Sequence, residues 1–210
     1  MITFLFLDVK KAPKKQTKNI MFVAHPDDET IFGGKEILEN NYFIVCITNG
    51  NNPVRSHEFK QLLEKSNNQG VILTYPDMVQ AKRANWKQER GKIKEDIKKY
   101  IEQKQWDKIV THNPQGEYGH KHHQMTSQLV REVIKEEEKT ERLYYFVPYF
   151  TKEGRRPSKT MNKREEQKLK QLATLYPSQK HTVGVYYHIF GYQDIISYRD
   201  WNEKYTQKQK

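Results

Sequence analysis

Cysteine is almost absent from this sequence, with one residue in 210, and its scarcity excludes two kinds of architecture. A single thiol, Cys46, can form neither an internal disulfide nor a zinc site built from several cysteines. Cys46 lies in the apolar run 42–47, where a small buried hydrophobic residue is typical.

Long apolar runs are also missing. No stretch approaches the ~18 consecutive apolar residues that a membrane-spanning helix needs. The apolar start at residues 1–7 is too short for the core of a signal peptide, and its lysines follow it instead of preceding it. We therefore expect an intracellular, cytoplasmic protein without a membrane span.

Two glycine-rich signatures are absent as well. The first predicted strand is not followed by Gly-x-Gly-x-x-Gly, and Gly-x-x-x-x-Gly-Lys-Ser/Thr does not occur. Nothing in the sequence therefore favours a dinucleotide-binding site or a nucleotide phosphate loop.

Basic residues outnumber acidic ones by 37 to 26, which gives a formal net charge of +11. Such an excess attracts polyanions in some proteins and is only a solvated surface in others. The lysines here are spread over both ends and the predicted helices, without one basic motif interleaved with aromatic residues. We favour the solvated surface and expect no nucleic-acid partner, while peripheral contact with anionic lipid stays open.

Apolar runs of strand length alternate with helical segments along the first two thirds of the chain. The predicted strands are 20–24, 42–48, 71–75, 108–111 and 142–147, and the helices between them are 30–40, 54–68, 87–104 and 120–138. Alternation with short connections predicts an α/β fold, a Rossmann-like three-layer sandwich with a mostly parallel sheet.

The predicted organisation is a single domain with extensions at both ends. We expect an N-terminal arm at 1–18, one α/β domain at 19–200 and a polar tail at 201–210. The part of the domain from about residue 150 is expected to form a cap, with a helix at 163–175 and strands within 184–198.

An imidazole and three carboxylates follow the first predicted strand. The apolar run ends at His25-Pro-Asp-Asp-Glu29 because Pro26 cannot donate to a sheet ladder. Open α/β sheets bind their ligands at the carboxyl ends of strands, and imidazole with carboxylate suits a divalent metal, most commonly zinc. The alternative is that the acidic residues only cap a helix.

A second polar segment follows the predicted strand 108–111. It reads Thr-His-Asn-Pro-Gln-Gly-Glu-Tyr-Gly-His-Lys-His-His over residues 111–123 and contains four of the eight histidines. His120 and His123 are three positions apart at the start of a predicted helix, so they share one face of it. Because the carboxyl ends of parallel strands lie at one edge of a sheet, the two segments can meet in space.

The two segments together predict a mononuclear metal site. His25, one of Asp27 and Asp28, and one of His120 and His123 would provide three ligands and leave the open position of a catalytic zinc. The remaining carboxylate could take a proton from water, and the remaining histidine could stabilise an oxyanion or protonate a leaving group. The alternative is that these histidines hold a loop by hydrogen bonds.

Four segments resemble the signatures of the N-acetylglucosaminylphosphatidylinositol de-N-acetylase family, also called PIG-L or LmbE-like. They are Ala24-His-Pro-Asp-Asp-Glu29 with Gly33-Gly34 behind it, the segment 111–123, the middle elements Arg55-x-x-Glu58, Gly70-Val71 and Pro76-Asp77, and the late Tyr176-Pro-Ser-Gln179. The resemblance covers about residues 19–180, and the first two segments are the most specific.

The resemblance implies a role for each residue of the two main segments. It implies one zinc ion held by His25, Asp28 and His123, with Asp27 as the general base. It gives His120 the part of assisting the oxyanion or the leaving amine. The implied activity is a zinc-dependent hydrolase that removes the acetyl group from a small N-acetylated amino sugar of the N-acetylglucosamine type.

The middle segment implies substrate contacts, and one position departs from the family pattern. Arg55 and Asp77 match an arginine and an aspartate that the family uses for substrate. Lys121-His122 stands where family members often carry Pro-Asp. The alternatives to deacetylation are a metal hydrolase of another amide or ester, and a basic polyanion-binding protein with a vestigial metal site.

Overall fold

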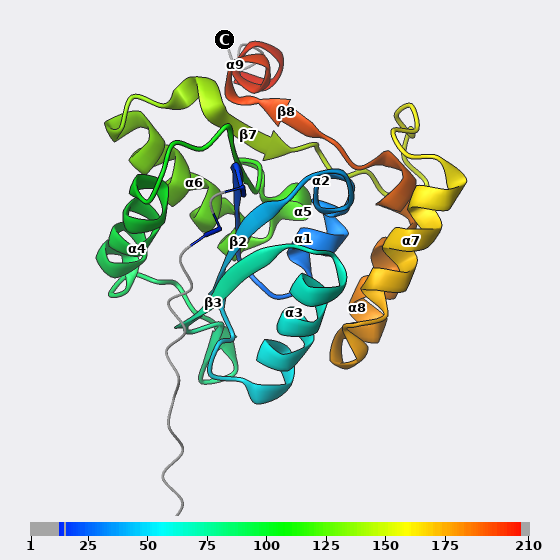
Figure 1. Ribbon diagram of the computed structural model, residues 1–210, viewed down its shortest axis with the longest axis horizontal. Coiled ribbons are helices and arrows are strands. Elements are labelled where there is room, and N and C mark those ends of the chain that lie inside the picture. Colours follow the sequence, from blue (N-terminus) through cyan, green and yellow to red (C-terminus); the bar gives the residue numbers. More distant parts are fainter. Residues whose placement is uncertain (1–12, 15, 207–210) are drawn as a thin grey trace, which may run out of the picture.

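The computed structural model describes residues 13–14 and 16–206 (Figure 1). Most of the predicted N-terminal arm lies outside these residues, as do the last four residues of the predicted tail. Within the described part of the chain, no helix is both long and apolar enough to cross a membrane.

One six-stranded sheet forms the middle layer of the molecule, in the order β3-β2-β1-β6-β7-β8. Its strands are β1 Asn19–Val23, β2 Tyr42–Thr48, β3 Gln69–Tyr75, β6 Lys108–Thr111, β7 Leu143–Phe146 and β8 Ile195–Ser197. All pairings are parallel except that of β8 with β7. Strand β1, the first strand of the described residues, is thus central, between β2 and β6, and its carboxyl end meets theirs at one edge.

Helices cover both faces of the sheet (Figure 1). One face packs against α4 Arg90–Glu102, α6 Lys121–Glu136 and α9 Tyr198–Trp201. The other packs against α1 Asp28–Ile31, α2 Gly34–Glu39, α3 Pro53–Lys65, α7 Lys163–Ala173 and α8 Lys180–Tyr186. The predicted α/β class, a Rossmann-like three-layer sandwich with a mostly parallel sheet, is confirmed.

The central strand shows why both faces need cover. Ile20 and Phe22 belong to the core cluster on one side of the sheet, whereas Met21 and Val23 belong to the cluster on the other side. Alternate side chains of a strand point to opposite faces. A strand that is apolar at every position therefore needs a helical layer on each side.

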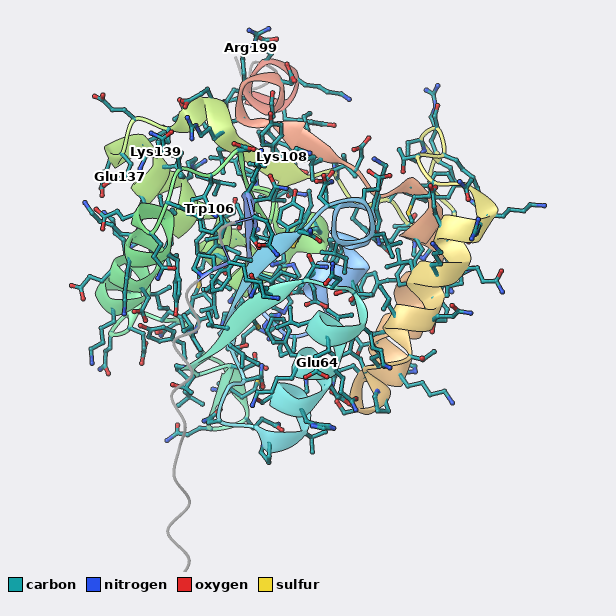
Figure 2. The ribbon with its side chains drawn as sticks, in the orientation of Figure 1. Glu64, Trp106, Lys108, Glu137, Lys139 and Arg199 are labelled. Carbon is teal, nitrogen blue, oxygen red and sulfur yellow. The ribbon has the colours of Figure 1, made fainter. Side chains whose placement is uncertain are left out.

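Short elements complete the described chain. They are β4 Met78–Val79 and β5 Lys82–Arg83, which form an antiparallel hairpin, the kinked α5 Gly116–Gly119, η1 Thr140–Arg142, η2 Pro177–Gln179, η3 Tyr187–Tyr192 and the π-helical η4 Asn202–Thr206. Charged side chains project from the periphery of the molecule, as Arg199 illustrates with 83% of its side chain exposed (Figure 2).

The helix predicted at 30–40 is two helices, separated at Phe32 and Gly33. The backbone at Gly33 approaches the sheet so closely that a Cβ there would lie 2.8 Å from Cε of Met21 and 2.9 Å from Cε1 of Phe146. The sequence places a glycine at this close approach, and the helix changes direction there.

The strands predicted within 184–198 are mostly helical. Residues 180–192 form α8 and η3, and only β8 at 195–197 is extended. The aromatic and β-branched residues suggested strands, but helical spacing brings Val183, Ile189 and Phe190 into one core cluster with α7. Tertiary packing therefore decides the local structure of this segment.

Candidate metal centre

The loop after β1 and the first residue of α1 carry three buried polar side chains at the carboxyl edge of the sheet. His25, Asp27 and Asp28 expose 8%, 5% and 3% of their surface. Asp27 has φ 125° and ψ −26°, a conformation that L residues rarely adopt. The backbone here is held by Arg55 of α3, whose guanidinium donates to the carbonyl of Pro26 and lies 3.4 Å from Oδ2 of Asp27. Strained backbone of this kind gathers at functional sites.

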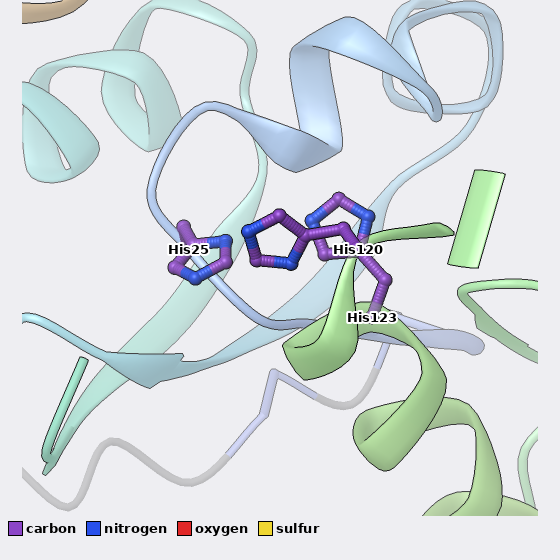
Figure 3. A group of neighbouring side chains, drawn as sticks. All are labelled: His25, His120 and His123. Atoms are coloured by element: carbon purple, nitrogen blue, oxygen red, sulfur yellow. The ribbon is translucent and has the colours of Figure 1, made fainter. Parts of the chain in front are cut away.

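The second motif reaches the same place from the neighbouring strand. β1 and β6 pair in parallel with Phe22 opposite Thr111, so the loops that follow them leave the sheet side by side. One ring nitrogen from each of His25, His120 and His123 lies within 4.8 Å of the others. Figure 3 shows these rings close together, His25 from the loop after β1 and the other two from the start of α6.

Asp28 lies between His25 and His123. Its Oδ2 is 3.1 Å from Nδ1 of His25, and its Oδ1 is 3.2 Å from Nε2 of His123. That Nε2 is buried and has no hydrogen-bond donor or acceptor paired with it among the described residues. Two ligands of a tetrahedral zinc, each about 2.0–2.1 Å from the ion, lie roughly 3.3 Å apart.

Glu117 of α5 binds the far side of His123. Its Oε2 is 2.6 Å from Nδ1 of His123 and 2.9 Å from Nδ1 of His112, and its Oε1 accepts from the backbone N–H of Asn113 at 2.9 Å. Burial alone would raise the pKa of Glu117, but His112 and His123 lower it to about 2. The Glu117 carboxylate thus accepts a hydrogen bond from the Nδ1–H of His123, and the Nε2 lone pair of a neutral ring faces Asp28.

His112 is close to Asp28, but both of its ring nitrogens have partners within the protein. When the ring is neutral, the backbone N–H of Ala24 donates to Nε2 of His112 at 3.1 Å. When the ring is protonated, Nε2 faces Oδ2 of Asp28 at 3.4 Å, and in both forms Nδ1 faces Glu117. Both ring nitrogens therefore have partners, although Asp28, His112 and His123 together have the spacing of a metal site. His112 joins β1 to the loop after β6.

A third polar group lies on the opposite side of the His25 ring. Nε2 of His25 is 3.1 Å from Nδ1 of His122 and 3.4 Å from Oδ1 of Asp77. Nδ1 of His122 is 3.5 Å from the same Asp77 oxygen, so this group also has the spacing of metal ligands. Here, however, Arg83 of β5 supplies the positive charge, with Nη1 2.7 Å from Oδ1 of Asp77.

The two adjacent aspartates have opposite pKa shifts. Burial and then the charge of Asp28 raise the pKa of Asp27 well above its ordinary value. Burial would raise the pKa of Asp28 too, but His123 and His25 hold it well below its ordinary range. Paired groups whose environments separate their pKa values in this way are typical of acid–base sites.

The pKa values of His120 and His25 are also shifted in opposite directions. Burial, followed by the charges of His123 and His25, lowers the pKa of His120 to about 2. Burial would also lower the pKa of His25, but the carboxylates of Asp28 and Asp77 raise it to about 9. His120 is therefore neutral near pH 7, and its buried Nδ1 has no hydrogen bond among the described residues.

All seven residues singled out from the sequence lie at or beside this edge of the sheet: His25, Asp27, Asp28, Arg55, Asp77, His120 and His123. Sequence reasoning missed Arg83 and left Glu117 and His122 without definite roles. Glu117 had a usable signal, since it lies six positions before His123 in the same turn, whereas Arg83 lies on a hairpin with no recognisable motif.

Aromatic rings line one side of the centre. Tyr118 is 45% exposed, and its ring centroid lies 5.7 Å from those of both His120 and His123. Tyr186 of α8 is 5.5 Å from Tyr118, and Phe32 is 5.6 Å from His123. The centre thus opens beside an apolar, partly exposed surface.

Comparison with known structures shows the same fold in another protein. The structure of GalB, the 4-carboxy-2-hydroxymuconate hydratase from Pseudomonas putida, matches with a TM-score of 0.57 and covers 82% of this chain and 84% of that one. The sequence identity is 16%, so this similarity describes the fold.

Sequence comparisons identify relatives. An uncharacterized protein of Acanthamoeba polyphaga mimivirus is 30% identical over 142 residues, which are 60% of this chain and 61% of that protein. The chain thus spans about three fifths of the length of this relative. The family model for GlcNAc-PI de-N-acetylases matches residues 20–134, more than half of the chain and both segments of the centre. The protein therefore belongs to the PIG-L family of GlcNAc-PI de-N-acetylases.

Proposed function

We propose that this protein is a zinc-dependent N-deacetylase that removes the acetyl group from an N-acetylglucosamine-type substrate. The observation that carries the proposal is the free Nε2 of His123, which is buried, has no hydrogen bond among the described residues and lies 3.2 Å from Oδ1 of Asp28. A buried nitrogen without a partner is costly unless a ligand occupies the space in front of it.

The donor set fits one zinc ion. His25, Asp28 and His123 offer two imidazoles and a carboxylate, the ligand set that leaves a catalytic zinc with an open position. Glu117 behind His123 is the carboxylate that orients a ligating imidazole and increases its basicity. When bound, zinc supplies a Lewis acid that polarises a carbonyl and lowers the pKa of water.

Asp27 is the proposed general base. Asp27 adjoins the proposed ligand Asp28, and among the described residues its carboxylate forms no hydrogen bond or ion pair with His25 or His123. Arg55 lies 3.4 Å from its Oδ2. Its raised pKa suits a group that accepts a proton from the attacking water and later returns it to the leaving amine. Arg55 keeps the carboxylate in place, and it is also a proposed substrate contact.

His120 is proposed to assist the tetrahedral oxyanion. With a pKa of about 2, the His120 ring is neutral near pH 7 and has one N–H that can donate a hydrogen bond to developing negative charge. It carries no extra proton that it could transfer to a leaving group. This difference favours Asp27, not His120, as the group that protonates the amine.

The substrate is proposed to be a small N-acetylated amino sugar. The exposed face of Tyr118 beside the histidines suits the apolar face of a sugar ring. Asp77, with 28% of its side chain exposed, is the proposed partner for a sugar hydroxyl. Peripheral contact with anionic lipid is a further proposal that rests on the net charge of +11.

The test is acetate release from a panel of N-acetylglucosamine conjugates by zinc-loaded protein. Wild type, Asp27→Asn and the control Asp107→Asn, at an exposed position, are compared at equal zinc content. We expect wild type and the control to release acetate and a free amine at the same rate as each other. We expect Asp27→Asn to bind zinc but to hydrolyse the substrate at least 100-fold more slowly. Another pair of products would indicate a different amide or ester. Full zinc occupancy without any hydrolysis, together with salt-sensitive polyanion binding, would contradict the proposal.

A further inference from the structure

The side of His25 that faces away from Asp28 is enclosed by three side chains. Nε2 of His25 lies 3.1 Å from Nδ1 of His122, 3.4 Å from Oδ1 of Asp77 and 3.3 Å from Nη1 of Arg83. Because Arg83 also binds Asp77 at 2.7 Å, this group already holds a cation. It is therefore a support for the ring of His25 and not a second metal site.

His122 is fixed by its surroundings. Its ring is fully buried and stacks on Trp86, with centroids 4.1 Å apart and planes 9° from parallel. Nε2 of His122 lies 2.8 Å from the carbonyl oxygen of Ala84, which can only accept a hydrogen bond. The proton of this imidazole is therefore on Nε2, and Nδ1 presents a lone pair to His25.

The proton on His25 follows from its neighbours. Three groups surround Nε2 of His25. The Nδ1 atom of His122 and the carboxylate of Asp77 accept hydrogen bonds, and Arg83 donates its N–H to Asp77. When the ring is neutral, which is the form that can bind a metal, Nε2 of His25 is thus the nitrogen that carries the proton. The lone pair is then on Nδ1, which lies 3.1 Å from Oδ2 of Asp28 on the side of His123.

We propose that His122 is a positioning residue that fixes the tautomer of His25, so that Nδ1 is the nitrogen presented to the metal. The proposal rests on the proposed function, because it assumes zinc at His25, Asp28 and His123. A chain of hydrogen bonds runs from the carbonyl of Ala84 through both rings. This chain of hydrogen bonds depends on the imidazole of His122, a position at which the similar signatures often carry aspartate.

Two substitutions separate the hydrogen bond from the packing of the ring. His122→Phe keeps a flat ring on Trp86 but has no acceptor for His25, whereas His122→Asn loses the stacking but can offer an oxygen close to the place of Nδ1. Zinc affinity is measured by competition with a chromogenic chelator. We expect His122→Phe to bind zinc 10–100-fold more weakly than wild type and His122→Asn to stay within a few-fold of it.

A second readout reports the tautomer directly. Long-range ¹⁵N–¹H spectra of the zinc-loaded protein distinguish a protonated ring nitrogen from a ligating one. We expect Nε2–H and a zinc-bound Nδ1 for His25 in wild type and His122→Asn, and a mixture of tautomers in His122→Phe. Circular dichroism and unfolding curves show whether each variant is folded, and the spectrum of wild type tests the tautomer even if one variant is not.

The outcomes distinguish this inference from the proposed function. Wild-type affinity in a folded His122→Phe, or zinc on Nε2 of His25, would overturn the role of His122 whatever the enzyme hydrolyses. The expected affinities and tautomer without acetate release would support the role of His122 and contradict the deacetylase activity. A wild-type protein that binds no zinc would overturn both.

Discussion

The hydroxyl of Tyr176 donates a hydrogen bond to Oε1 of Glu29 at 2.8 Å, across 147 positions of the chain. Both side chains are fully buried. The other oxygen of Glu29 accepts from the backbone N–H of Asp27 at 3.2 Å. Two positions further on, Ser178 binds Glu58 of α3 through its backbone N–H and its hydroxyl, at 2.7 and 2.6 Å. The late Tyr-Pro-Ser-Gln element thus supports the loop of the proposed base from behind.

Tyr176→Phe should destabilise the protein by about 1–2 kcal/mol, because a buried carboxyl oxygen loses a hydrogen bond. The rate of hydrolysis should fall as well, since Glu29 holds the backbone of Asp27. Urea unfolding and initial rates measure the two effects. Tyr144→Phe is the control, because the Tyr144 hydroxyl has no hydrogen bond among the described residues and should cost less than 0.5 kcal/mol. Equal effects of the two substitutions would contradict the role given to Tyr176.

Gly34→Ala should destabilise the protein by about 1–3 kcal/mol through a steric conflict. A Cβ at Gly34 would lie 2.3 Å from Cδ1 of Leu169 and 2.7 Å from Oε1 of Gln193, so the buried side chains of Leu169 and Gln193 would have to shift. Gly91→Ala is the matched control in α4, where nothing lies within 4 Å of the new carbon. There the substitution should stabilise by up to about 1 kcal/mol. Chemical denaturation of both variants checks the difference in sign.

Zinc should stabilise wild type against heat and should not stabilise His123→Gln. A ligand that binds only the folded state adds about 2.7 kcal/mol at a free concentration of 100 times its dissociation constant. His57→Gln, at an exposed position of α3, should respond to zinc as wild type does. Melting curves with added zinc or with a chelator give the comparison, and an equal zinc response in all three proteins would indicate that the ion binds elsewhere.

The pair of His112 and Glu117 should give the metal-free protein a stability maximum in mildly acidic solution. Glu117 has a folded pKa of about 2 against an ordinary 4.5, so its stabilisation is complete above pH 4.5 and is lost as the pH falls towards 2. His112 has a folded pKa of about 9 against 6.5, so its stabilisation is complete below pH 6.5 and is lost as the pH rises through 9.

The pair therefore contributes most between pH 4.5 and 6.5. The difference in unfolding free energy between wild type and Glu117→Gln, measured in urea with a chelator present, should be largest in that window and smaller on both sides of it. A difference that does not change with pH would show that the two groups do not titrate as a pair.

Local pattern predicted the fold because its central strands are apolar at most positions and are separated by helical segments. Tyr42–Thr48 and Lys108–Thr111 have the bounds read from the sequence. The break at Gly33 and the helical course of residues 180–192 depended on contacts with distant segments, namely β7 and α7. Such contacts leave no periodic signal in the residues themselves.

The proximity of the candidate site residues could be predicted because the carboxyl ends of parallel strands lie at one edge of a sheet. The hydrogen bonds that each residue makes could not be predicted in this way. Parallel strands place His25 and His123 at one edge, and that much could be inferred from the sequence. Whether a ring nitrogen is free depends on single neighbours, as the N–H of Ala24 on Nε2 of His112 shows. Arg83 was missed for the same reason, because only the β4–β5 hairpin brings it to Asp77.

The central position of β1 has a consequence for synthesis on the ribosome. The residues of the first motif are made early, but β6 and the start of α6 lie roughly 90 positions later and must dock beside β1 before His123 faces Asp28. Contacts between such distant segments form late in folding. A nascent chain that stops before β6 can hold at most His25 and Asp28 of the proposed ligands. On the proposed ligand set, all three ligands are therefore available only once the chain has been translated as far as the start of α6.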